Sequence, residues 1–179
     1  IDNLVKVKVA NAVMVREGYE LKEGFSKALE TYYDAYVRSM KFDGKALEAI
    51  NGWCNEQTEG LIPKILEQIN PGACLYAMNS IYFKGAWAEK FEKENTRQEA
   101  FTNIDGTSDK VWMMHMEDLF TYSANDVWAT VRLPYGNGSY SMYVLLPHKE
   151  KSIEDMMAVL NAQTWESEKN SMRSNTVDL

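Results

Sequence analysis

The sequence predicts a fold of the α+β class, in which strands and helices alternate at first and strands joined by turns follow. Three observations support this prediction. Residues 5–15 read as a strand, residues 25–57 carry two helical repeats of apolar side chains, and residues 75–83 form a nearly continuous apolar run. A run rich in aromatic and β-branched residues is typical of a strand covered on both faces. We therefore expect residues 75–83 to be an interior, largely buried strand.

Composition is typical of one globular unit. The 179 residues are 45% hydrophobic and 25% charged, which is enough for one core and short for two domains. The net charge of −7, without a Lys/Arg cluster, disfavours nucleic acid or an anionic membrane as a partner. No apolar run reaches the roughly 18 residues that span a bilayer. Ile1–Leu4 is neither an initiator Met nor a signal peptide, so we expect Ile1 not to be the natural start.

The first expected strand begins with valines that alternate with Lys6 and Lys8, continues through Ala12–Val15 and ends before Gly18. A short amphipathic helix follows, because apolar residues recur at helical spacing from Phe25 to Tyr36. It runs into a strand-like segment, residues 36–42, and a turn at residues 43–44 ends that segment.

A second helix is expected from Lys45 onward. The residues on its apolar face are Ala46, Ile50, Trp53 and Gln57, and residues 58–60 close it. We expect this helix to pack across the same sheet as residues 75–83. In that run the polar residues are Asn79 and Ser80, and Lys84-Gly85 ends it. Trp87 and Phe91 then stand on a charged segment as aromatic anchors.

Beyond Phe101 the pattern changes to strands and turns. Asp105-Gly106 precedes a strand over residues 110–116, and residues 136–139 join residues 128–135 and 140–146 into a hairpin. Ser152 and Asp155 are spaced as a capping box ahead of a helix, and a second short helix is expected at residues 165–169. Residues 176–179 read as the start of another strand.

Candidate chemical groups are few. His115 and His148 lie in none of the usual hydrolase, zinc or phosphate-loop motifs. Met113–Met116 offers soft ligands that suit copper, but strand alternation would place Met114 and Met116 on one face and Met113 and His115 on the other. Cys54 and Cys74 are either one disulfide or, as we expect, two buried thiols. Asn137-Gly138-Ser139 is either a glycosylation sequon or, as favoured, a tight hairpin turn.

The residues from Asn79 to Phe101 closely resemble a signature of the serpins, the family of suicide-substrate protease inhibitors. The matching residues are Asn79, Ile81-Tyr82-Phe83-Lys84-Gly85, Trp87, Phe91, Asn95-Thr96 and Phe101. Further serpin-like motifs stand in family order at Ile50-Asn51, Trp53, Thr58, Gly60, Ile62, Val111, Met113-Met114, Leu133-Pro134-Tyr135, Ser141-Met142 and Leu146-Pro147. The sequence is therefore similar to an internal part of a serpin.

The resemblance implies a serpin fold, with a large central β-sheet covered by helices and with smaller sheets. Residues 1–179 would be the central part of a single domain, without the family's N-terminal helices and its C-terminal reactive-loop region. The implied mechanism is physical: a protease cleaves an exposed loop, which inserts as an extra strand into the central sheet. It needs no catalytic residue, cofactor or metal, so the chain is expected not to be an enzyme.

The resemblance also assigns candidate site residues. Those of the loop-insertion and sheet-opening region are Asn79, Phe83, Lys84, Gly85 and Trp87, and those of the helix covering the sheet are Asn51, Trp53 and Thr58. Asn79 is either a satisfied core amide or a latch that holds the central strands together, since an Asn in an apolar strand needs hydrogen-bond partners. Trp87 is either part of the insertion region or a general anchor at the end of a strand.

The expected partners are a serine protease, or a cysteine protease, and the rest of the serpin polypeptide, and the family points to an extracellular or secreted location. Two rivals to inhibition remain. One is a non-inhibitory serpin that acts as a carrier, chaperone or binding protein. The other is an unrelated enzyme or binding domain, which a structure without a sheet beneath the helix at residues 45–57 would indicate.

Overall fold

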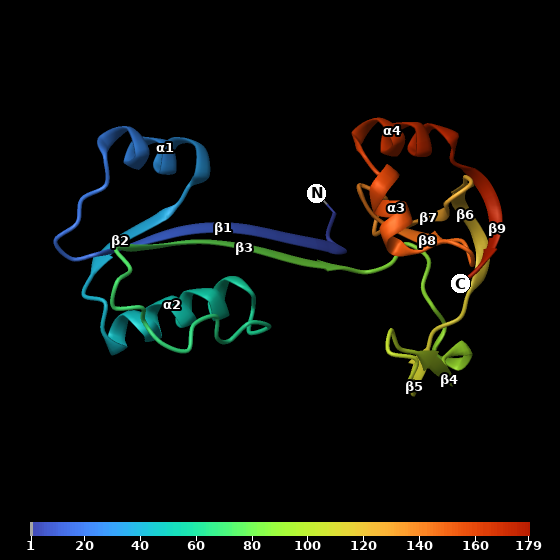
Figure 1. Ribbon diagram of the computed structural model, residues 1–179, viewed down its shortest axis with the longest axis horizontal. Coiled ribbons are helices and arrows are strands. Elements are labelled where there is room, and N and C mark those ends of the chain that lie inside the picture. The colour runs from blue at the N-terminus through green and yellow to red at the C-terminus, as the bar shows by residue number, and fades with distance from the viewer. Residues whose placement is uncertain (1) are drawn as a thin grey trace. The chain divides into compact units, whose positions relative to one another are not determined.

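The computed structural model describes residues 2–179, which divide into two compact units. The first unit comprises residues 6–84, and the second comprises residues 85–179 together with the described residues before Lys6. Figure 1 labels the helices and strands of both. The two units were not distinguished at the level of sequence, where composition suggested a single one.

The first unit contains a three-stranded sheet in the order β2-β1-β3, formed by β1 (Val5–Arg16), β2 (Tyr36–Met40) and β3 (Leu75–Gly85). β2 is parallel to β1, with Ala12 opposite Tyr36 at one end of the ladder. β3 runs antiparallel to β1: the N–H of Arg16 donates to Cys74 O (2.8 Å), and 12 residues earlier Leu4 O accepts from the N–H of Ala86 (2.9 Å).

Helices α1 (Glu23–Tyr33) and α2 (Gly44–Gln57) cover opposite faces of this sheet (Figure 1). Successive side chains of a strand point to opposite faces. Val13 and Val15 of β1 therefore pack against Leu29 of α1. Ala12 and Met14 pack against Ile50 of α2 in a separate cluster. The prediction that the second helix packs across the sheet is confirmed.

The strand predicted at residues 75–83 is present as β3, but the prediction that it is interior and largely buried is wrong. Among residues 2–179, β3 pairs only with β1 and lies at one end of the sheet. Ser80 and Tyr82 are its only buried residues, whereas Ile81 is 69% exposed. An apolar run indicates that both faces of a strand need cover, but it carries no information about whether both edges have neighbours.

The end of α2 is attached to the sheet by one carboxylate. Glu59, whose backbone adopts the left-handed conformation (φ 53°), accepts a hydrogen bond from Nζ of Lys6 on β1. It also accepts one from the hydroxyl of Tyr82 on β3. The hydrogen bond from Lys6, and then that from Tyr82, lowers the pKa of Glu59, and Glu59 in turn raises the pKa of Lys6 and of Tyr82. The Glu59 side chain thus joins the end of α2 to both β1 and β3.

The second unit contains two sheets. β4 (Arg97–Thr102) and β5 (Ser108–Met113) form an antiparallel pair after a short 3-10 helix, Lys93–Asn95. The other sheet has the order β8-β7-β6-β9 and is formed by β6 (Glu117–Ala124), β7 (Trp128–Tyr135), β8 (Tyr140–Pro147) and β9 (Arg173–Asp178), all antiparallel to their neighbours. The predicted hairpin is confirmed as β7 and β8.

Several boundaries differ from the sequence prediction, among them the start of β9 and the end of β5. β9 begins three residues earlier than residue 176, because Arg173 to Asp178 form a ladder with β6. β5 ends at Met113, so the predicted alternation from Met114 to Met116 is wrong. The N–H of Met116 instead donates to Leu179 O (3.1 Å), and Met116 packs against the cluster of Phe120, Val131 and Leu133.

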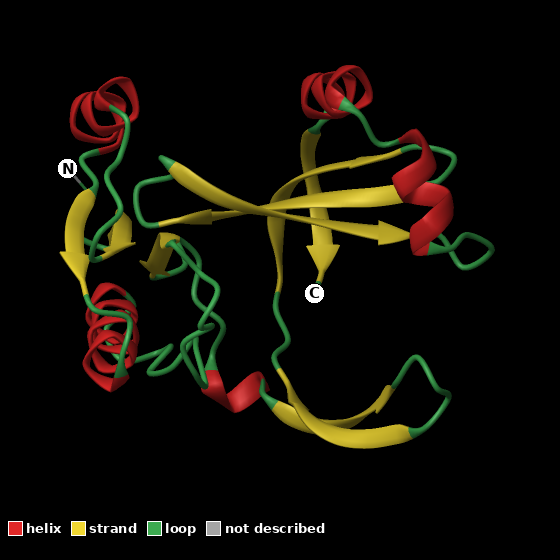
Figure 2. Ribbon diagram, turned by 60° about the vertical axis from the view of Figure 1, so that its left-hand side comes forward, coloured by secondary structure: helices red, strands yellow, loops and turns green. Residues whose placement is uncertain are grey.

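Helices α3 (Ile153–Val159) and α4 (Ala162–Ser171) complete the second unit and are drawn as red coils beside its strands in Figure 2. The capping box of α3 is confirmed: Ser152 Oγ accepts from the N–H of Asp155 (3.0 Å), and Asp155 accepts from the N–H of Ser152 (2.9 Å). α4, which was predicted around residues 165–169, is longer at both ends, and its earlier start follows from a second capping box between Asn161 and Thr164.

A buried glutamate joins α4 to the sheet of the second unit. Glu168 accepts hydrogen bonds from the hydroxyls of Ser123 (2.6 Å) on β6 and Thr130 (2.9 Å) on β7. Its other oxygen accepts from the amide of Asn125 (2.9 Å). Glu168, Ser123 and Thr130 are all buried, so these hydrogen bonds satisfy groups that water cannot reach.

Both cysteines are free thiols, which excludes a disulfide between Cys54 and Cys74. The expectation of two buried thiols is confirmed for Cys54 and wrong for Cys74, which is exposed because it lies in the turn segment before β3 rather than in the strand. Within the described part of the chain, no helix is long and apolar enough to cross a membrane.

The first prediction concerns Glu168. Replacing Glu168 with Ala in the full-length protein should leave three donors without an acceptor and lower the free energy of unfolding by about 2–4 kcal/mol. Denaturant unfolding measures this loss. The matched control is Glu166→Ala on the same helix, where a 63% exposed side chain pairs with Lys169 and the change should stay below about 0.5 kcal/mol. Equal losses in both variants would contradict a special role for Glu168.

The second prediction is a pH dependence at Glu59. Because the pKa of Glu59 is lowered from the ordinary 4.5, its stabilisation is fully present above pH 4.5 and is lost as the pH falls through the lowered value. The raised pKa of Tyr82 acts at alkaline pH. The stabilisation from its hydroxyl is fully present below pH 10.0 and is lost as the pH rises through the raised value. Wild type should therefore exceed Glu59→Gln in stability at neutral pH, and the difference should shrink below pH 4.5.

Unfolding midpoints of both proteins between pH 7 and pH 3 test this expectation. Glu67→Gln serves as the control, because Glu67 forms an exposed pair with Lys64 that joins no separate elements. A stability difference between wild type and Glu59→Gln that stays constant over this range would argue against the ionised carboxylate as its source.

Candidate functional site

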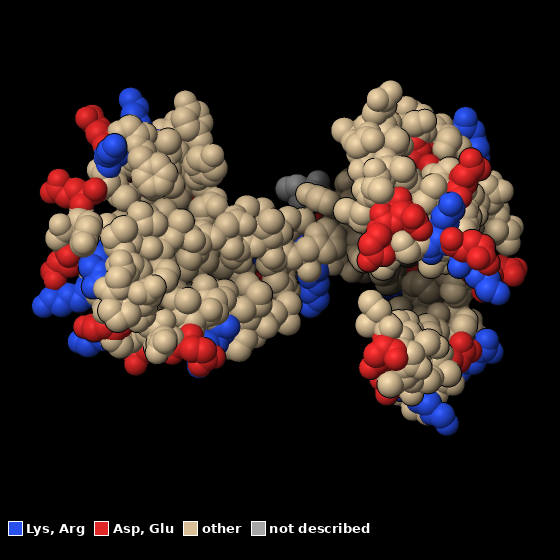
Figure 3. Space-filling view, in the orientation of Figure 1, with Lys and Arg blue, Asp and Glu red and all other residues tan. Residues whose placement is uncertain are grey.

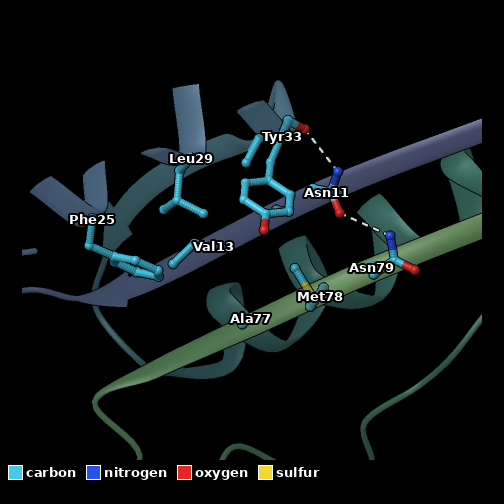
Figure 4. Close-up of a pocket in the computed structure, with 10 residues that line it drawn as sticks. Asn11, Val13, Phe25, Leu29, Tyr33, Ala77, Met78 and Asn79 are labelled. Atoms are coloured by element: carbon cyan, nitrogen blue, oxygen red, sulfur yellow. Dashed lines mark hydrogen bonds between the residues drawn. The ribbon is translucent and has the colours of Figure 1, made fainter. Parts of the chain in front are cut away.

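A chain of side-chain hydrogen bonds crosses one face of the sheet at Asn79 (Figure 4). Asn79 Nδ2 on β3 donates to Asn11 Oδ1 on β1 (2.9 Å) and approaches Ala10 O (3.4 Å). Asn11 Nδ2 in turn donates to Tyr33 O, in the last turn of α1 (2.8 Å). Asn79 therefore has the hydrogen-bond partners that the sequence required, and it ties β3 to β1 and indirectly to α1. It is exposed, not a buried core amide.

An apolar hollow of about 300 Å³ lies beside this chain of hydrogen bonds, between α1 and the sheet (Figure 4). Leu29 of α1 and Val13 of β1 are buried at its floor. Further apolar residues along it include Phe25, Ala35 and Ala77, and its polar margin is formed by Asn11 and Asn79. The two amides thus border a surface that is otherwise hydrocarbon.

On the opposite face, α2 and the segment after it cover the sheet. Asn51 Oδ1 accepts from the N–H groups of Ile65 (2.9 Å) and Leu66 (3.0 Å), and Asn51 Nδ2 donates to Leu66 O (3.0 Å). The hydroxyl of Thr58 donates to Cys54 O (2.8 Å) and accepts from the N–H of Ile62 (3.0 Å). Both residues therefore hold the segment that follows α2, and their side chains do not bond to the sheet.

Trp53 differs from these two residues because it packs on the sheet. It lies against the buried cluster of Ala12, Met14 and Ile50. Of the three residues predicted on the covering helix, Trp53 supplies apolar contact, while Asn51 and Thr58 fix the connection from α2 toward β3.

The residues predicted at the end of β3 fall into different units. Phe83 and Lys84 are exposed residues of the first unit, and Gly85 is the last residue of β3. Trp87 belongs to the second unit, where its ring stacks on Tyr135 with centroids 4.3 Å apart. Trp87 also packs on the cluster of Phe120, Val131 and Leu133.

Sequence reasoning missed Asn11 and Glu59. Asn11 interrupts the apolar half of β1, and a polar side chain within such a run was a usable signal. Its pairing with Asn79 depends on the antiparallel register of β1 and β3, which the sequence does not reveal. Glu59 carried no signal, because an exposed glutamate just after a helix is common.

The remaining candidate groups are the two histidines and any cluster of metal-ligating side chains. His115 Nε2 lies 3.1 Å from Glu99, and His148 Nε2 lies 2.7 Å from Asn125 O. Over residues 2–179 there is no group of three or more His, Cys, Asp or Glu side chains that could hold a metal ion. On the face drawn in Figure 3, acidic and basic side chains are intermingled within each unit.

Comparison with known proteins identifies the family. The family model "Serpin (serine protease inhibitor)" matches residues 2–179. A serpin-like protein of Methanosarcina mazei is 32% identical over 176 residues, which cover 94% of this chain and 41% of that protein. The chain thus spans less than half the length of this relative.

Solved serpin structures have the same fold. The thermophilic serpin tengpin, at 25% identity, superposes with a TM-score of 0.90 in its native state and 0.89 in its latent state, and the match covers 99% of this chain and less than half of tengpin. Thyroxine-binding globulin complexed with thyroxine-fluorescein, at 21% identity, gives a TM-score of 0.89 over the whole chain and 54% of that protein. With a family match over residues 2–179 and this shared α+β fold, the chain belongs to the serpin family.

Proposed function

We propose that the whole protein inhibits a serine-type endopeptidase as a suicide substrate, by inserting its cleaved reactive loop into the sheet that contains β3. In this proposal residues 1–179 are the central part of a single domain, the protein is not an enzyme, and it acts outside the cell. Its partners are the protease, of the serine or the cysteine class, and the rest of its own polypeptide. Membership of the serpin family, in which many proteins are protease inhibitors, supports the proposal.

The observation that supports the proposal is the position of β3 at the end of the sheet that residues 2–179 form. Among residues 2–179, β3 pairs with β1 alone, so the backbone groups of its other edge meet no strand. Such an edge is a template for a further strand, since an added strand satisfies the backbone N–H and C=O groups of both partners. A cleaved loop is an extended segment of the kind that such an edge accepts.

In this mechanism the protease attacks the loop with its own nucleophile and becomes acylated. The freed loop then joins the sheet, and the release of stored strain displaces the protease before the acyl bond is hydrolysed. The chain described here contributes a sheet that opens and closes, and no group of it takes part in the covalent step.

The candidate residues have distinct roles in this proposal. Asn79, through Asn11, holds β3 to β1 until the loop enters. Phe83, Lys84 and Gly85 form the end of β3 where insertion starts, and Trp87 fixes the chain that follows. Asn51, Trp53 and Thr58 keep α2 and its following segment over the sheet while β3 moves.

A non-inhibitory carrier is the second candidate function. The hollow of about 300 Å³ beneath α1 has the apolar lining and few polar groups that are typical of small-molecule sites. One structural relative is a globulin solved in complex with a thyroxine derivative. In this alternative the protein binds a ligand and does not trap proteases.

The third prediction separates these two functions. Full-length protein incubated with trypsin-, chymotrypsin- and elastase-like proteases should give, with at least one of them, a complex that survives SDS and contains one molecule of each. The protease mutated at its nucleophile is the control and should give no such complex. Cleavage of the protein by every protease, without any SDS-stable complex, would exclude inhibition of these protease classes and favour the carrier.

The fourth prediction tests the link between β1 and β3. Asn79→Ala in the full-length protein should remove the hydrogen bond to Asn11 and lower the stability of the uncleaved form by about 0.5–1.5 kcal/mol. The loop-cleaved form should change less, because insertion rearranges the strands beside β3. Thermal unfolding of both forms measures the two shifts.

Asn11→Ala and the double variant complete a thermodynamic cycle for this pair. If the two amides act through one hydrogen bond, the double variant should lose less stability than the sum of the single variants. Equal losses in the uncleaved and cleaved forms would leave Asn79 as an ordinary structural amide.

A further inference from the structure

The turn between β7 and β8 contains Asn137-Gly138-Ser139, the only Asn-x-Ser/Thr sequence in the chain. The sequence favours a tight turn as the reason for this asparagine, because Asn tolerates the left-handed conformation. The turn is present, but glycines take its left-handed positions, with φ of 49° at Gly136 and 86° at Gly138. Asn137 does not have a positive φ. The backbone conformation of the turn therefore does not require an asparagine.

The backbone of this turn is held by other groups. The N–H of Gly138 donates to Tyr135 O (2.7 Å), and the N–H of Gly136 donates to Ala86 O (2.9 Å). The guanidinium of Arg132 donates to Gly138 O (3.3 Å). All three hydrogen bonds use main-chain groups of the turn. They do not depend on the side chain that stands between the two glycines.

The side chain of Asn137 has one group that the turn uses and one that it does not. Its Oδ1 accepts from the N–H of Ser139 (3.0 Å), a bond that an aspartate would make equally well. The group that only asparagine supplies is Nδ2, which makes no hydrogen bond within residues 2–179. The hydroxyl of Ser139 also makes none there, and both residues are exposed.

We propose that Asn137 is a site of N-linked glycosylation. The two side-chain groups that the fold leaves unused, Nδ2 of Asn137 and the hydroxyl of Ser139, are the two that the acceptor sequence Asn-x-Ser requires. This inference rests on the proposed location outside the cell, because the transfer takes place in the secretory pathway.

The donor in this transfer is a lipid-linked oligosaccharide. Nδ2 forms a bond to the anomeric carbon of its first sugar, and the bond from that carbon to the lipid diphosphate breaks. Nδ2 loses one proton to the medium, and the lipid diphosphate leaves with the electron pair of the broken bond. The product amide keeps its oxygen, so the hydrogen bond from the N–H of Ser139 to Oδ1 is retained. The folded turn therefore loses no hydrogen bond to the glycan.

The test is peptide mass spectrometry of the full-length protein, secreted from a eukaryotic cell line with a cleavable secretory leader. The peptide that contains residues 137–139 should carry a glycan. Peptide N-glycosidase should remove it and leave an aspartate in place of the modified Asn137. Because the peptide is identified directly, glycans elsewhere in the whole protein do not affect the result.

Ser139→Ala should abolish the glycan on Asn137 and leave the turn intact, because Oδ1 bonds to the N–H of Ser139 and not to its hydroxyl. Ser139→Thr should retain the glycan. The matched control is Ser141→Ala on β8, which removes a hydroxyl that accepts from Arg132 Nε (2.8 Å) but lies outside the acceptor sequence. That variant should be glycosylated like wild type.

An unmodified Asn137 in the secreted protein would overturn the proposal, and so would a glycan that persists in Ser139→Ala. A second arm uses the protein with its natural N-terminus. A glycan on the leader-directed protein alone would contradict both the proposed location and the glycan on the natural protein. Protease inhibition enters neither arm, so a failure of the proposed inhibition and a failure of this site are distinguishable.

Discussion

The first unit depends on the burial of β1 on both of its faces. The four residues from Ala12 to Val15 point alternately toward α2 and α1, and all four are buried. Two separate apolar clusters therefore lie on opposite faces of the same strand, β1. β2 and β3 pair only with β1 in the described part of the chain. A substitution in β1 would therefore alter the packing of both helices and of both neighbouring strands.

β3 is attached to its neighbours both by apolar packing and by polar side chains. Its attachments beyond the backbone ladder include polar side chains at two points, Asn79 to Asn11 on the face of α1 and Tyr82 to Glu59 on the face of α2. The hydrogen bond of an exposed group such as Asn79 exchanges with water at modest cost. Apolar burial does not exchange in this way, since it is lost only when surface is exposed. The exposed hydrogen bond of Asn79 is therefore broken at lower cost than the apolar packing of Tyr76 and Met78 against the cluster of Ala12, Met14 and Ile50.

The sequence predicted the order and type of the elements well, because periodicity and turn residues are local signals. The helix after Lys45, the capping box at Ser152 and the β7–β8 hairpin all follow from such signals. The sequence did not predict which strand lies at the edge of a sheet or which distant residues bond to each other. That β3 lies at the end of the described sheet, and that Asn79 meets Asn11, depends on strand order and register, which are set by the whole chain. Family resemblance supplied the candidate site, and local chemistry alone would not have found it.

The placement of the two cysteines has a practical consequence. The sequence has only Cys54 and Cys74, and Cys54 is buried whereas Cys74 is exposed in the turn immediately before β3. The carbonyl of Cys74 accepts from the N–H of Arg16, so the thiol stands where the β1–β3 ladder begins. Within residues 1–179, a thiol-reactive fluorophore would therefore attach at exposed Cys74 in preference to buried Cys54, and its emission would report on the environment at the start of β3.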